Sequence, residues 1–123
     1  MNINMHKLHN SIKIEGNITF QFSQDTEANS WYVFCPELRL QSFAPTMEQA
    51  KTNILEVIAF TFEDLIKDGE IEEYIHSIGG KIIDNYKTDF AIKVIANNKE
   101  YIFLPESSNY ITETTNHLNF DLV

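Results

Sequence analysis

The fold of this chain is decided by residues 31–66, whose sequence is WYVFCPELRLQSFAPTMEQAKTNILEVIAFTFEDLI. Apolar side chains on both parities of residues 31–35 predict a central strand that is buried on both faces. After a turn at Pro36-Glu37, residues 38–43 predict the next strand of an antiparallel meander. One long amphipathic helix then fills the rest of the stretch, so the segments before and after it must pair with these strands or pack on this helix.

The start and the end of the helix are both marked in the sequence. Residues 46–49, TMEQ, have the form of a capping box in which Thr46 accepts a hydrogen bond from the amide of Gln49. Asp68-Gly69 predicts termination by a left-handed glycine. Apolar residues at helical spacing form one stripe that suits packing across a sheet. This stripe consists of Met47, Ala50, Ile54, Ile58, Phe62 and Leu65.

The flanking segments extend this unit in both directions. Residues 12–22 alternate apolar and polar side chains, which predicts a half-buried strand in a hairpin with residues 31–35. Residues 70–78 predict a second, short helix that Gly79-Gly80 closes, and Asn97-Asn98 predicts a hairpin turn. Further strands are expected at residues 81–86, 90–96, 99–104 and 118–122. The fold class is therefore α+β, a three-stranded antiparallel meander packed on one long helix, followed by a short helix and a C-terminal β element.

The length of 123 residues suits one domain with a small appended element. We expect residues 1–10 to be a flexible N-terminus and residues 11–86 to form the core. Residues 87–123 are expected to form a C-terminal hairpin and a terminal strand, in which no DNA-binding domain is recognised. The terminal strand can pair within the chain or with a second copy, so a homodimer is one alternative for the assembly.

The net charge of −9 argues against nonspecific binding to nucleic acid or to anionic lipid. Residues 46–78 carry two Lys and eight Asp or Glu, a net charge of −6, so the acid is concentrated on the helical region. A solvated helix face explains this charge, and so does a surface that attracts a basic partner. The single cysteine, the lack of a signal-peptide pattern and the lack of a membrane-spanning run predict a cytoplasmic protein.

No catalytic, metal or cofactor pattern is found in the sequence. Cys35 could act as a nucleophile beside His76 or His117, but its apolar strand parity predicts a buried, inert thiol. His6 and His9 lack further metal ligands nearby in sequence, so a surface pair is expected. The sequence therefore predicts a protein that is not an enzyme and binds no cofactor.

One residue of the long helix is out of phase with its apolar stripe. Phe60 projects from the polar side, so either a later segment of the chain or a partner covers it. On charge and helical geometry, the predicted partner-binding residues are Glu56, Phe60, Glu63 and Glu70.

The same stretch resembles the HicB-type antitoxins. Residues 31–38, WYVFCPEL, are similar to the "Y-V-x-F-P-D-L" strand of that family, and residues 44–50, APTMEQA, stand where the family has "G-D-T-x-E-E-A". The resemblance covers residues 17–66. Ala44-Pro45 departs from Gly-Asp, and the family's Pro-Gly-Cys after the "P-D-L" segment is missing.

The resemblance implies a partial ribonuclease-H-like fold and a role in binding rather than catalysis. The partner of such proteins is HicA, a small basic ribonuclease toxin whose active site they block. Many members also carry a C-terminal DNA-binding segment, but residues 80–123 are expected to be strands here. Direct nucleic-acid binding is therefore not expected. The alternative is an orphan interaction module of the same fold that serves another partner, or dimerises, through its C-terminal strands.

Overall fold

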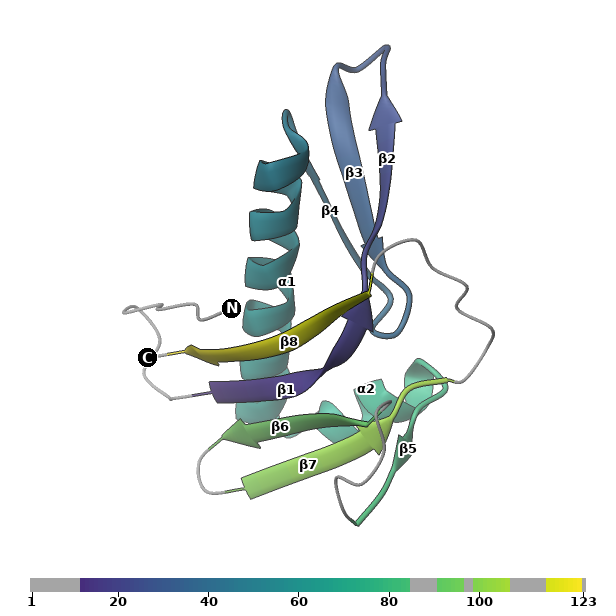
Figure 1. Ribbon diagram of the computed structural model, residues 1–123. Helices are drawn as coiled ribbons and strands as arrows, with labels where there is room; N and C mark the ends of the chain where they lie inside the picture. Colours follow the sequence, from purple (N-terminus) through teal and green to yellow (C-terminus); the bar gives the residue numbers. More distant parts are fainter. Residues whose placement is uncertain (1–11, 85–90, 97–98, 107–114, 123) are drawn as a thin grey trace.

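The computed structural model describes residues 12–84, 91–96, 99–106 and 115–122, and its elements are shown in Figure 1. The expected flexible N-terminus (residues 1–10) and the predicted turn at Asn97-Asn98 lie outside the described residues, as do residues 85–86 and 90 of two predicted strands. The described elements are β1 (Ile12–Thr19), β2 (Gln21–Asp25), β3 (Ser30–Cys35), β4 (Leu40–Ala44), α1 (Met47–Asp68), α2 (Ile71–Ser77), β5 (Lys81–Ile82), β6 (Ile92–Ala96), β7 (Lys99–Leu104) and β8 (Thr115–Leu122).

The strands form two antiparallel sheets. A three-stranded sheet has the order β2-β3-β4, and a five-stranded sheet has the order β5-β7-β6-β1-β8. The α+β class, the meander, the long helix and the short helix are thus confirmed. The terminal strand pairs within the chain, since β8 lies beside β1 with Ile12 opposite Leu122.

The predicted strand over residues 12–22 is divided between the two sheets. β1 ends at Thr19, the buried Phe20 marks the junction, and β2 begins at Gln21. Only β2 forms the predicted hairpin with β3, whereas β1 pairs with β6 and β8. Alternation of side chains fixes which face of a strand is apolar, but it does not determine which strand lies beside it.

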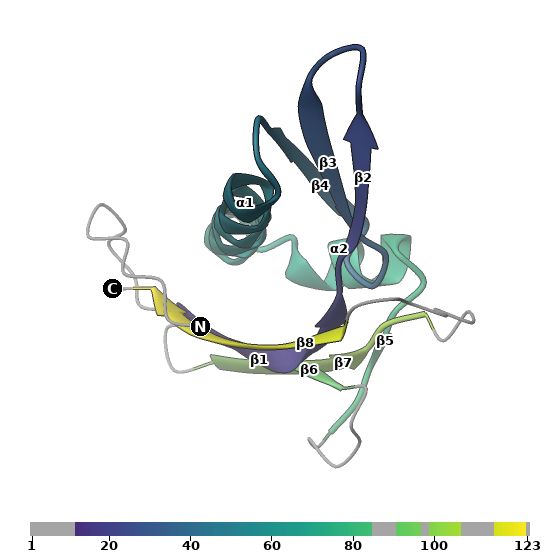
Figure 2. The same cartoon turned by 45° about the horizontal axis from the view of Figure 1, so that its top comes forward.

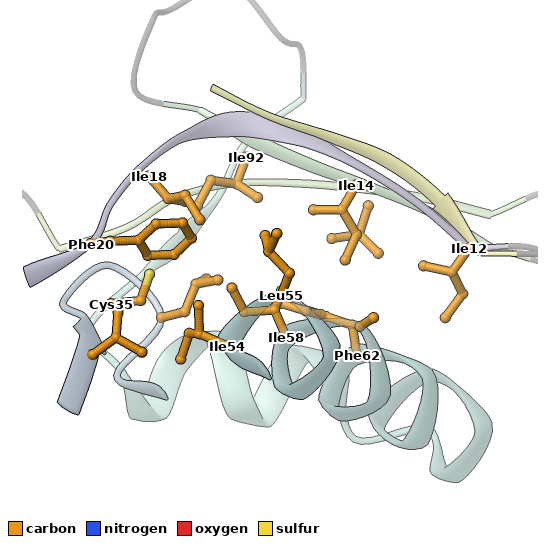
Figure 3. Close-up of a cluster of buried hydrophobic side chains, with 14 of the residues drawn as sticks. Ile12, Ile14, Ile18, Phe20, Cys35, Ile54, Leu55, Ile58, Phe62 and Ile92 are labelled. Carbon is orange, nitrogen blue, oxygen red and sulfur yellow. The ribbon is translucent and has the colours of Figure 1, made fainter. Parts of the chain in front are cut away.

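α1 lies in the angle between the two sheets, which is clearest in Figure 2. Its N-terminal cap is as predicted, because the Gln49 N–H donates to Thr46 Oγ1 at 3.1 Å. Its end is as predicted too, with Gly69 in the left-handed region at φ 72°. Figure 3 shows the core between helix and sheet. Its fully buried side chains include Ile12, Ile14, Ile18, Phe20, Ile54, Ile58, Phe62 and Ile92.

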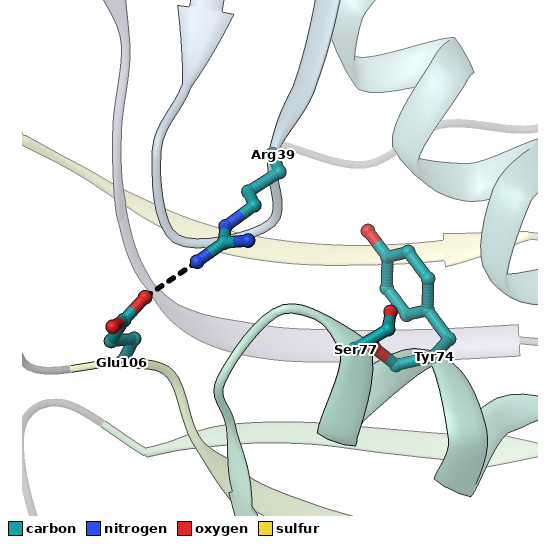
Figure 4. Close-up of polar contacts among 4 residues, drawn as sticks. All are labelled: Arg39, Tyr74, Ser77 and Glu106. Atoms are coloured by element: carbon teal, nitrogen blue, oxygen red, sulfur yellow. Dashed lines mark hydrogen bonds and ion pairs between the residues drawn. The ribbon is translucent and has the colours of Figure 1, made fainter.

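The β3–β4 turn, residues 36–39, makes the contacts that hold the two sheets together. The buried Glu37 carboxylate accepts from the Thr19 N–H (3.0 Å) and from the Thr19 hydroxyl (2.7 Å). The Tyr74 hydroxyl of α2 donates to the Leu38 carbonyl. Arg39 forms an ion pair with Glu106, just after β7, at 2.5 Å (Figure 4). A single turn therefore contacts the β1–β2 junction, α2 and the end of β7.

Replacing Thr19 by Val is expected to lower the free energy of unfolding by about 2 kcal/mol, because a buried hydroxyl that donates to a carboxylate is lost while the shape is kept. Denaturant unfolding measures this change. The matched control is Thr52→Val, whose exposed hydroxyl donates to the Glu48 carbonyl on α1, with an expected change below about 0.5 kcal/mol. Equal losses in the two variants would show that Glu37 does not hold the junction.

Candidate partner-binding surface

Three of the four predicted partner-binding residues share one side of α1. Glu56, Phe60 and Glu63 follow one another at spacings of four and three, which places them in one row on the helix. Phe60 is 41% exposed, as its phase predicts, and Glu56 is exposed, whereas Glu63 is half-buried. Glu70 is exposed but lies beyond the end of α1, at the N-terminus of α2, so the helix does not align it with the other three.

Phe43 is the most exposed large apolar side chain among the described residues, at 58%, and it is not one of the predicted partner-binding residues. It lies on the face of the three-stranded sheet that points away from α1. Tyr32 is opposite Phe43 in the register, with ring centroids 5.1 Å apart, and half-buried Phe34 lies on the same face. The sequence does contain a sign of this aromatic face, because Tyr32 and Phe34 alternate with Val33 and Cys35 and so share one face of β3. That face was expected to be buried, since apolar residues occupy both faces of the strand.

A hydrogen bond from a side chain of α1 joins the β4 edge of this sheet to the helix. The Asn53 amide donates to the Phe43 carbonyl at 3.2 Å, so the edge of β4 lies against the helix. Phe60 is two turns further along α1 on the same side as Asn53, a rise of about 10 Å. We define the aromatic–acidic surface as two parts that this hydrogen bond links: Tyr32, Phe34 and Phe43 on the sheet, and Glu56 and Phe60 on α1.

Cys35 does not have the properties of a nucleophile. It is fully buried, and burial first, then the charge of Glu37, raises the pKa of its thiol well above the ordinary value of 9.0. Its Sγ lies 3.6 Å from Glu37 Oε1. The thiol is therefore protonated at neutral pH, as its strand parity predicted. Within the described residues, no cluster of three or more His, Cys, Asp or Glu could hold a metal ion.

The buried thiol and the Tyr74 phenol are expected to make the protein less stable in alkali. Burial raises the pKa of both groups in the folded state, from ordinary values of 9.0 and 10.0, so unfolding releases protons at high pH. The free energy of unfolding should be independent of these groups below about pH 9 and should fall above it. Urea unfolding between about pH 8 and pH 11 measures the slope. Cys35→Ala should delay the fall to about pH 10, and an unchanged slope would contradict the assignment.

Phe43→Ala and Phe60→Ala are each expected to change the free energy of unfolding by less than about 1 kcal/mol, because Phe43 is 58% exposed and Phe60 41% exposed. Phe62→Ala, a fully buried phenylalanine on the same helix, should cost about 3–5 kcal/mol and serves as the control. Thermal or denaturant unfolding of the three variants makes the comparison. A loss for Phe60→Ala close to that of Phe62→Ala would place Phe60 in the core.

No family model matches this sequence, and no curated protein and no solved structure is significantly similar to it. In the described part of the chain, no helix is both long and apolar enough to cross a membrane. The features of this chain that point to a function are therefore the aromatic–acidic surface and the charge around it.

Proposed function

We propose that this chain is a non-catalytic, antitoxin-like protein of the cytoplasm that binds and neutralises a small basic ribonuclease of the HicA type. The observation that carries this proposal is the aromatic–acidic surface, where Phe43 and Phe60 are exposed at 58% and 41% on two elements joined by Asn53. The partner docks on this surface, and no cofactor takes part.

The composition of the surface suits a basic protein partner. Exposed aromatic side chains supply the large contact area that binding hot spots use. The charge of α1 is net negative, since Glu48, Glu56, Asp64 and Asp68 are exposed on it, with Lys67 as the exposed basic residue of its last turn. A field of this sign accelerates association with a basic partner and aligns it before contact.

The order of the elements supports the resemblance to HicB-type antitoxins. β2, β3, β4 and α1 follow one another along the chain, in the strand-strand-strand-helix order that the resemblance implies, and Thr46 caps the helix. Glu37 and Leu38 of the similar segment are buried and contact the β1–β2 junction and α2. That part of the pattern is explained by folding, so the proposed binding role depends on the exposed residues.

The alternative, an orphan module that binds through its C-terminal strands, has a specific structural consequence. β8 is an edge strand of the five-stranded sheet, and its described pairing is with β1. Deleting residues 105–123 would remove a neighbour of β1, so loss of binding after this deletion would not distinguish the two functions. Point variants on the aromatic–acidic surface do distinguish them.

The proposed function is tested by co-expressing the chain with the small basic protein encoded beside it. The chain should rescue growth from that toxin and co-purify with it. Phe60→Ala and Glu56→Lys should weaken the complex by more than about tenfold, as expected for an anchor and for a charge facing a basic partner. Binding of the wild-type chain should weaken as salt is raised.

Ile82→Ala is the matched control, because Ile82 is also a large apolar residue, 40% exposed, but lies on β5 of the other sheet. It should bind and rescue like the wild type. A neighbourhood that encodes no small basic protein, or a toxin that is not neutralised, would overturn the proposed function. Equal binding by Phe60→Ala and Ile82→Ala would overturn the proposed surface.

A further inference from the structure

The two edges of the three-stranded sheet have different surroundings. The β4 edge lies against α1, and the Asn53 side chain covers the Phe43 carbonyl. At the other edge, β2 belongs to a hairpin that projects from the rest of the molecule (Figures 1 and 2), and no described segment lies along its outer side in either view. Among the described strands, β2 is therefore an open edge at which another strand can be added.

The Asn53–Phe43 bond also determines which way the main chain of this sheet points. The Phe43 carbonyl accepts from Asn53, so it faces away from β3. Tyr32 lies opposite Phe43, and main-chain groups alternate in direction along an antiparallel strand, so the N–H and C=O of Tyr32 point to β2. Their partner there is Ser23, which is opposite Tyr32 in the register.

The next residues along β2 must then face outward. Since Ser23 directs its main-chain groups to β3, the N–H and C=O of Phe22 and Gln24 point away from the sheet. These are two donors and two acceptors, spaced symmetrically about Ser23. A strand with the same spacing, placed antiparallel, can pair with all four groups.

The side chains along this edge do not prevent such pairing. Residues 16–24 contain no Lys, Arg, Asp, Glu or Pro, although the chain as a whole has a net charge of −9. Charged residues, proline and short length are the devices that keep edge strands apart. Both edge strands of the five-stranded sheet have at least one of these features. β5 has only two residues and begins with Lys81, and β8 contains Asp121. β2 lacks such a device before Asp25, its last residue.

We propose that β2 pairs with β2 of a second copy of this chain, antiparallel about Ser23, to form one six-stranded sheet. The Phe22 N–H donates to the carbonyl of the partner subunit's Gln24, and the reciprocal bonds follow from two-fold symmetry. Ser23 then faces its own counterpart, and Gln21 lies opposite the carboxylate at position 25, so no like charges are opposed. This inference rests on the main-chain geometry of β2 and not on the proposed function. Phe60 and α1 lie beyond the opposite edge of the sheet, whereas Tyr32 of the aromatic–acidic surface is opposite Ser23 in the register.

The contact is short, so a weak and reversible dimer is expected. A strand of five residues contributes much less area than the roughly 1,200 Å² of a stable interface. Two chains of charge −9 also repel each other until salt screens them. The dimer should therefore strengthen as salt is raised, whereas binding of a basic partner should weaken.

Sedimentation velocity of the full chain, at several protein and salt concentrations, tests this pairing. The wild type should show a concentration-dependent equilibrium between monomer and dimer. Ser23→Lys and Ser23→Glu should each raise the dissociation constant by about fivefold or more, because like charges then meet at the two-fold axis. An equimolar mixture of the two variants should restore dimers, which a misfolded variant could not do.

Thr52→Lys is the control for the change in net charge, because Thr52 is exposed on α1, away from β2. It should dimerise at least as well as the wild type. A wild-type chain that stays monomeric at every concentration would overturn the proposal. Dimers that persist unchanged in both Ser23 variants would overturn it too, since they would assign the interface to another surface.

Discussion

The buried carboxylate of Glu37 is the constraint on which the arrangement of this protein depends. It accepts two hydrogen bonds from Thr19, at the point where the chain leaves one sheet and enters the other. Bonds to an ionised acceptor are stronger than bonds between neutral groups, and a buried carboxylate without them would be costly. The bend between β1 and β2 is therefore fixed, and with it the angle between the sheets that α1 occupies.

That angle also determines which apolar groups remain in solvent. The apolar stripe of α1 packs against both sheets, so a residue outside the stripe, such as Phe60, stays 41% exposed. α1 covers one face of the three-stranded sheet, and Tyr32 and the exposed Phe43 lie on the other. The exposed aromatic surface and the open β2 edge are two consequences of one layout.

Local signals in the sequence predicted the elements better than their arrangement. Thr46 and Gly69 mark the ends of α1 because capping is determined by neighbouring residues, and the strand at residues 99–104 has the predicted bounds. The exposure of Phe60 followed from its helical phase alone. The division of residues 12–22 between two sheets, and the exposure of Phe43, depend on which distant element lies beside each strand, which periodicity does not encode.

The pairing of β1 with β8 has a consequence for how the protein folds during synthesis. The β2–β3–β4 hairpins and α1 are built from contacts between near neighbours in sequence, which form quickly. β1 is made before them, but its partners β6 and β8 are made much later, with Ile12 opposite Leu122. Until β6 and β8 leave the ribosome, the main-chain edges of β1 stay unpaired, so β1 is exposed to aggregation and to chaperones for longer than β2, β3 and β4 are.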